Sequence, residues 1–116
     1  MNILGISGFF HDSAACLVQD GKIISAAEEE RFSRIKHDSS FPTRAIKYCL
    51  DENNINISDI DYIAFYEKPF NKFDRILKTH LFFAPKSFRS FKSSIPPWIK
   101  DKIWVKEKIQ QSLKFK

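Results

Sequence analysis

Three short, mostly apolar runs separated by polar residues and glycines occupy the first quarter of the chain. The runs at 2–7, 14–19 and 22–28 are rich in β-forming residues, so the pattern predicts three strands. Asp20-Gly21 separates the last two runs, and this pair suits the positive φ angles of a two-residue hairpin turn. Because the runs follow one another through short links, we expect an antiparallel meander.

Helical spacing begins after Phe41-Pro42, where proline suits the first helical position. The helix is predicted to end near Asn53-Asn54, with one apolar face formed by Ala45, Ile46, Cys49 and Leu50. The following run, 60–66, is almost wholly apolar and predicts a strand covered on both faces. A strand–helix–strand connection of this kind favours a parallel neighbour in the same sheet.

The pattern becomes helical from residue 70 onward. We expect one helix that ends at Pro85, a short helix or turn over 86–94, and a last helix from Pro96-Pro97 to about Phe115. Their apolar positions are Phe70, Phe73, Leu77 and Leu81, then Phe88 and Phe91, then Ile99, Ile103, Ile109 and Leu113. The fold class is therefore α/β, a mixed sheet that opens with a three-strand meander and carries helices.

Charge divides the chain in two near Pro69. Residues 1–67 hold six Lys/Arg and eleven Asp/Glu, whereas residues 68–116 hold thirteen Lys/Arg and three Asp/Glu. We therefore expect a first part, 1–69, and a helical, basic, Phe-rich continuation, 70–116. The basic half is consistent with an anion or nucleic-acid surface, with a solvated basic face, or with one side of a contact with something missing.

Composition and length indicate one folded domain. The 116 residues are 43% hydrophobic and 15% aromatic, with no apolar run long enough to cross a bilayer and no signal peptide. We expect a cytoplasmic protein without a membrane partner. Cys16 and Cys49 form no disulfide framework or metal cluster, and both are expected to be small buried residues.

Two His-Asp-Ser triplets, at 11–13 and 37–39, carry the candidate chemistry. The first lies on a strand-to-strand loop, where backbone N–H groups and a small hydroxyl can face a phosphate and His11 can act as acid or base. With three histidines and no closely spaced pair, we expect no zinc or iron site. A hydrolase triad lacks its Gly-x-Ser-x-Gly turn, and an ordinary loop histidine remains the alternative for His11.

The opening half resembles a known family through a dense set of motifs. These are Ile3-Leu4-Gly5-Ile6, His11-Asp12-Ser13-Ala14-Ala15, Asp20-Gly21, Ala26-Ala27-Glu28-Glu29-Glu30-Arg31-Phe32-Ser33-Arg34, Lys36-His37-Asp38, Phe41-Pro42, Ala45-Ile46, Cys49-Leu50 and Tyr66-Glu67-Lys68-Pro69. Together they closely resemble the N-terminus of the O-carbamoyltransferase family, which includes nodulation-factor and antibiotic carbamoyltransferases. The match is dense to about residue 70 and looser beyond.

The resemblance implies an actin-like ATPase fold, related to ribonuclease H, and a carbamoyl transfer reaction. Such enzymes take carbamoyl phosphate and ATP, form a carbamoyl-adenylate, and pass the carbamoyl group to a hydroxyl of a sugar-containing acceptor. By this resemblance His11 is the catalytic residue and Asp12 and Ser13 support it. Arg31, Lys36 and His37 are expected anion contacts, with a salt-bridged loop involving Glu28–Glu30 as the alternative.

The chain departs from the family in length. Family members are several times longer, with a second lobe, and their divalent-metal pair of His-x-x-x-His form is absent because His80 stands alone. We therefore expect an N-terminal portion, from a truncated gene, a split gene or an excerpt, that is inactive alone and poorly soluble or oligomeric. The acceptor and the metal are left open.

Two other functions compete with the carbamoyltransferase fragment. A small nucleic-acid-binding protein would use the basic half, where Phe88, Phe91, Trp98 and Trp104 alternate with cations. We consider it less consistent with the motifs. The second competing function is that of a non-catalytic subunit, which would complete a separately encoded C-terminal part.

Overall fold

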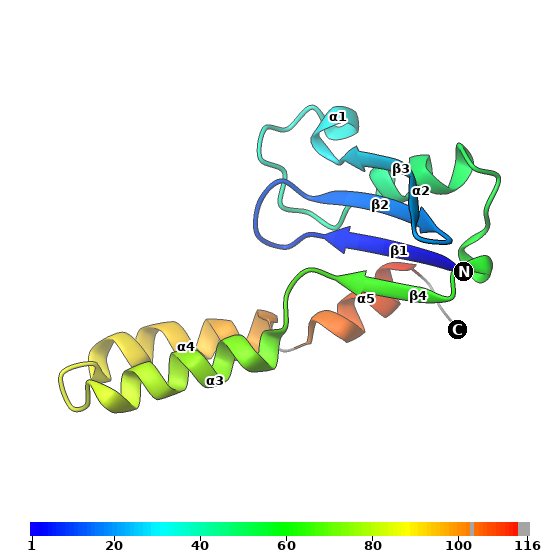
Figure 1. The fold of residues 1–116 in the computed structure, drawn as a ribbon. Coiled ribbons are helices and arrows are strands. Elements are labelled where there is room, and N and C mark those ends of the chain that lie inside the picture. Colours follow the sequence, from blue (N-terminus) through cyan, green and yellow to red (C-terminus); the bar gives the residue numbers. More distant parts are fainter. Residues whose placement is uncertain (103, 114–116) are drawn as a thin grey trace. The chain divides into compact units, whose positions relative to one another are not determined.

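The computed structural model describes residues 1–102 and 104–113, which are drawn in colour in Figure 1. They belong to two compact units, Met1–Tyr66 and Glu67–Lys116. The first unit combines a sheet with helices, and the second is helical. The fold is therefore α/β, as the sequence pattern predicts.

The first unit is built on a mixed four-stranded sheet. Its strands are β1 (Asn2–Ser7), β2 (Ala14–Gln19), β3 (Lys22–Glu28) and β4 (Tyr62–Phe65), in the order β3-β2-β1-β4. The β1–β2 and β2–β3 pairs are antiparallel, and β4 runs parallel to β1. Both the predicted meander and the predicted parallel neighbour are confirmed.

The β2–β3 hairpin turn has the conformation that its sequence predicts. Asp20 and Gly21 adopt φ angles of 50° and 81°, which place both residues in the left-handed region. A Cβ added at Gly21 would contact nothing within 4 Å, so the backbone angle alone demands glycine there.

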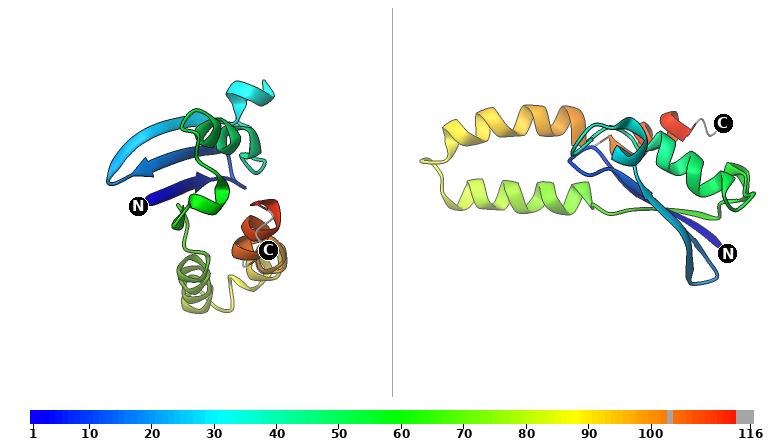
Figure 2. Two further views of the ribbon diagram at one scale, coloured as in Figure 1. Left: turned by 90° about the vertical axis from the view of Figure 1, so that its right-hand side faces the viewer. Right: turned by 90° about the horizontal axis from the view of Figure 1, so that it is seen from above.

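Helix α2 (Thr43–Asp51) covers one face of the sheet, as the two views of Figure 2 show. Leu4 and Leu17 on the strands and Ala45 and Cys49 on the helix are fully buried and form the core. Two shorter elements, α1 (Glu30–Ser33) and the 3₁₀ turn η1 (Ile57–Asp59), were not expected from the sequence pattern. The thiols of Cys16 and Cys49 are free, and Cys16 is only half-buried.

Strand β4 is more exposed than its composition predicts. Its residues alternate between exposed and half-buried, and Tyr62 is 64% exposed. The expectation of a strand covered on both faces is therefore wrong for the described residues. Apolar composition alone cannot distinguish a central strand from one at the end of the strand order, which is where β4 lies.

The second unit contains three helices, α3 (Pro69–Phe82), α4 (Phe88–Lys102) and α5 (Val105–Leu113). The helix before Pro85 is confirmed, but a break at Pro96-Pro97 is wrong because α4 continues through both prolines. Phe91, Ile95 and Ile99 continue one helical stripe across them. The predicted position Ile103 and the predicted end at Phe115 lie outside the described residues. No helix in the described ranges has the length and apolarity to cross a membrane.

Candidate functional site

The loop between β1 and β2 is hydrogen-bonded along its length to the segment that precedes α2. The Phe9 N–H donates to the Ser39 carbonyl at 3.0 Å, and the Ser13 N–H donates to the Asp38 carbonyl at 2.9 Å. These two bonds bring together the two His-Asp-Ser triplets, which lie about 25 residues apart in the chain. The site is therefore made from two loops rather than one.

Asp12 is the centre of this site because its carboxylate binds both histidines. Its Oδ2 is 2.7 Å from His11 Nδ1, and its Oδ1 is 2.7 Å from His37 Nδ1. The hydrogen bond from His37, followed by that from His11, holds the pKa of the Asp12 carboxyl below its usual value. An ionised carboxylate only accepts, so each Nδ1 carries the hydrogen and Nε2 is left to exchange protons.

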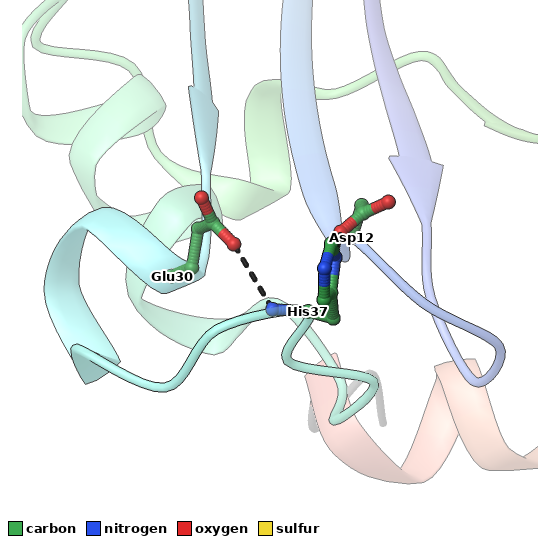
Figure 3. A group of neighbouring side chains, drawn as sticks. All are labelled: Asp12, Glu30 and His37. Atoms are coloured by element: carbon green, nitrogen blue, oxygen red, sulfur yellow. Dashed lines mark hydrogen bonds and ion pairs between the residues drawn. The ribbon is translucent and has the colours of Figure 1, made fainter.

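His37 responds in the opposite direction. Its hydrogen bond to Asp12 raises the pKa of His37 above its usual value, with the Asp12 and Glu30 charges adding to the effect. The backbone N–H of His37 also donates to Glu30 Oε2 at 3.1 Å, the contact dashed in Figure 3. His37 is thus held from both its ring and its backbone, and it favours the cationic form.

Asp12, Glu30 and His37 also form a group of potential metal ligands. Figure 3 shows them gathered from three segments, and one ligand atom from each lies within 4.8 Å of the others. Both Asp12 oxygens already accept hydrogen bonds from imidazole nitrogens. The group is therefore a hydrogen-bonded cluster in this geometry, and no step is assigned to a metal here.

Glu29 has a structural role that the sequence pattern did not reveal. It is 4% exposed, and its carboxylate accepts from the N–H groups of Arg44 and Ala45 at 3.0 and 2.9 Å. These groups lie in the first turn of α2, whose N-cap residue, Pro42, makes no side-chain cap. Because the Glu29 N–H also donates to the Ser13 carbonyl, Glu29 joins the start of α2 to the first loop.

The two loops hold several residues in an unusual backbone conformation. Phe9, Asp12, Arg34 and His37 have φ angles of 68°, 49°, 61° and 56°. Asp and His tolerate this left-handed region, whereas for Phe it is a clear outlier. The Phe9 ring lies 5.9 Å from that of Phe41 and 6.5 Å from that of Phe65, and this packing offsets the strain.

The remaining predicted residues occupy different surroundings. Ser13 is 1% exposed, and its buried hydroxyl has no hydrogen-bond partner among the described residues. Arg31 is exposed in α1, with Nε 3.9 Å from Glu28 Oε2, so the salt-bridged alternative describes its present contact. Lys36 is exposed between α1 and His37. The structure therefore brings together His11, Asp12 and His37, with Ser13 beneath them and Arg31 paired elsewhere.

Glu29 and Glu30 are the residues of the site that sequence reasoning missed. Pro42 at the N-cap position has no side-chain oxygen to offer, which is a signal that the helix takes its cap from elsewhere. Glu30 gives no such signal, because its contact with His37 depends on the path of the intervening loop.

The sequence that forms this sheet and its His–Asp–His cluster matches a known protein family. Residues 2–115 match the family described as Carbamoyltransferase N-terminus. The chain therefore belongs to the carbamoyltransferase family and corresponds to its N-terminal domain.

Several longer proteins are similar to this chain. An uncharacterized protein, sll1178, of Synechocystis sp. is 51% identical over 112 residues, which are 97% of this chain and 18% of that protein. The nodulation protein NolNO of Sinorhizobium fredii is 55% identical over 58 residues, 50% of this chain and 8% of its own length. The chain thus spans less than a fifth of either relative.

Proposed function

We propose that this chain is the N-terminal part of an ATP-dependent carbamoyltransferase with an actin-like ATPase fold. The reaction takes the carbamoyl group from carbamoyl phosphate and delivers it to a hydroxyl of a sugar-containing acceptor. The observation that carries the proposal is the double hydrogen bond of Asp12 to His11 and His37, within a chain of this family. The chain alone is inactive, because the remaining part of the site lies outside it.

Each side chain has a role that follows from its chemistry. Asp12 fixes the Nδ1–H tautomer of His11, so Nε2 of His11 is the nitrogen that accepts and returns a proton. His37, favoured as a cation, and the adjacent Lys36 bind phosphate oxygens, and Arg31 joins them by leaving its contact with Glu28. The buried Ser13 hydroxyl, which has no hydrogen-bond partner in the part of the chain that the structure describes, supplies a further donor to the bound substrate. When bound, ATP would supply the adenylyl group that activates the carbamoyl group, and a divalent metal would be held outside this chain.

The test uses a chimera in which this chain replaces the matched 112 residues of the Synechocystis relative. Pyrophosphate release from ATP that depends on carbamoyl phosphate needs no knowledge of the acceptor. The chimera is expected to show this activity, and His11→Asn is expected to lower its rate by at least about 100-fold. Substitution of a histidine in the helical unit, His80→Asn, is the matched control and should leave the rate within about twofold.

Two results would contradict the proposal. If the chimera is active and His11→Asn leaves its rate unchanged, His11 has no catalytic role. Pyrophosphate release by the 116-residue chain without the rest of the relative would show that the site is complete in this chain.

A further inference from the structure

The loop between β1 and β2 presents an aromatic ring directly beside His11. The centroid of the Phe10 ring lies 4.5 Å from that of the His11 ring, and the two ring planes are inclined by 46°. Phe10 is 63% exposed, so it gains little from burial in the core of the first unit. Core packing therefore does not account for the position of this ring.

Phe9 and Phe10 are neighbours in the chain but lie in different surroundings. Phe9 is half-buried and packs against Phe41 and Phe65, whereas Phe10 is exposed with its ring at His11. The backbone of Phe9 is left-handed, with a φ angle of 68°. A bulky residue in this conformation is strained, and strain of this kind concentrates at functional sites. The turn at Phe9 therefore indicates a function for the residues that follow it.

The short segment that holds both rings is fixed at its two ends. Backbone N–H groups of Phe9 and Ser13 donate to carbonyls of the segment 38–39 at 3.0 and 2.9 Å. Phe10 and His11 lie between these two anchored positions, so backbone motion that would separate their rings is restricted. The contact between the rings is therefore organised before any substrate binds.

The hydrogen bond to Asp12 does not by itself fix the orientation of the His11 ring. It holds Nδ1 of His11 2.7 Å from Asp12 Oδ2, but the ring can still turn because χ2 of histidine has broad minima. The His11 side chain is also 58% exposed, so the core does not hold it. A second side chain packed against the ring restricts its rotation, and Phe10 is in that position.

The Phe10 ring also suits a histidine that gains a proton. In the proposed function Nε2 of His11 accepts a proton and later returns it, and the imidazole is a cation between these two events. A cation within about 6 Å of an aromatic centroid is attracted by the negative face of the ring. Phe10 can therefore stabilise the protonated His11 without adding a charge to the site.

We propose that Phe10 is a positioning residue that acts through His11. It holds the imidazole ring in the orientation set by Asp12 and stabilises this ring while Nε2 is protonated. Phe10 itself exchanges no proton and forms no bond with the substrate. The inference rests on the proposed function, because it assigns Phe10 a part in the proton transfer at His11.

The ring contact is tested by NMR of the 116-residue chain without substrate. Phe10→Leu keeps an apolar side chain but removes the ring current, so the chemical shifts of the His11 ring protons should change. Phe10→Tyr keeps the ring and should keep these shifts. Phe82→Leu is the matched control, because Phe82 is 83% exposed and its ring lies 5.2 Å from that of Phe83. It should leave the His11 signals unchanged.

The effect on the reaction is measured in the chimera. Phe10→Leu is expected to lower kcat for pyrophosphate release about tenfold and to leave KM for carbamoyl phosphate within about twofold, because an oriented His11 acts in the transition state rather than in binding. Phe10→Tyr should bring kcat back to within about twofold of the parent value, and Phe82→Leu should change neither constant by more than about twofold.

Three results would overturn the inference. Unchanged His11 signals in Phe10→Leu would show that the two rings are not in contact in solution. A higher KM with an unchanged kcat would make Phe10 a substrate contact rather than a positioning residue. A low kcat in Phe10→Tyr would show that the aromatic ring is not what the site requires. If the parent chimera is inactive, the proposed function fails, while the His11 signals still decide whether Phe10 holds the ring.

Discussion

Asp12 links the protonation of His37 to the stability of the first unit. Its lowered pKa contributes stability that is complete above pH 3.8 and is lost as the pH falls through that lowered value. The raised pKa of His37 contributes stability that is complete below pH 6.5 and is lost as the pH rises through the raised value. The interaction therefore stabilises the fold most between pH 3.8 and 6.5.

Asp12→Asn is expected to return the pKa of His37 toward its ordinary value of 6.5, because the substitution removes the carboxylate charge. An NMR titration of the His37 ring protons measures the change. Asp51→Asn removes an exposed carboxylate of α2 and serves as the control. An unchanged His37 titration in Asp12→Asn would show that Asp12 does not control this ring.

Glu29 offers a second prediction at the residue scale. Glu29→Ala leaves the first-turn N–H groups of Arg44 and Ala45 without their buried acceptor. The free energy of unfolding should fall by about 1–3 kcal/mol, measured by urea denaturation and circular dichroism. Its neighbour Glu28 is exposed and paired loosely with Arg31, so Glu28→Ala should cost no more than about 0.5 kcal/mol. Equal effects of the two variants would refute the capping role.

The residue types of the site could be predicted from the sequence, but the contacts between them could not. The chemical types of His11, Asp12 and His37 were identifiable from their motifs. The contact of Asp12 with His37 joins residues 25 apart, and that of Glu29 with Ala45 joins residues 16 apart. Such contacts depend on loop paths with left-handed residues, and periodicity carries no information about them.

Strands and their turn were predictable because their signals are local. Short apolar runs defined β1 to β3, and Asp20-Gly21 defined the hairpin by its backbone preference. The prolines at 96 and 97 misled because propensity is a weak guide where one apolar stripe continues through a helix. Exposure of β4 was unpredictable for a similar reason, since strand order is set by tertiary packing.

The glycines of the first unit give a prediction at the scale of the strand. Gly21→Ala forces a side chain into the left-handed region and should lower the free energy of unfolding by about 1 kcal/mol. Gly5→Ala should instead raise it by about 0.5 kcal/mol, because the strand conformation accepts a Cβ. Thermal denaturation of both variants tests the pair. Destabilisation by Gly5→Ala would show that the isolated fold itself needs this glycine.

At the scale of the whole molecule, the chain carries exposed apolar residues on its helices. Near the junction of α3 and α4, Phe82 is 83% exposed, Phe88 is 67% exposed and Leu81 is 66% exposed. The surrounding segment, residues 75–100, contains six Lys/Arg and no Asp/Glu. Exposed aromatic surface of this kind favours association, and the cations oppose it at low salt.

The 116-residue chain is therefore expected to self-associate at micromolar concentrations, more strongly as salt increases. Replacing Leu81, Phe82 and Phe88 together by serine should shift the population toward monomer, because these side chains provide the apolar contact area. Sedimentation velocity at two salt concentrations measures the distribution. The matched control replaces exposed polar residues of the same segment, Thr79, Lys86 and Arg89, by serine. A parent chain that stays monomeric at both salt concentrations would show that its apolar surface is already covered within one molecule.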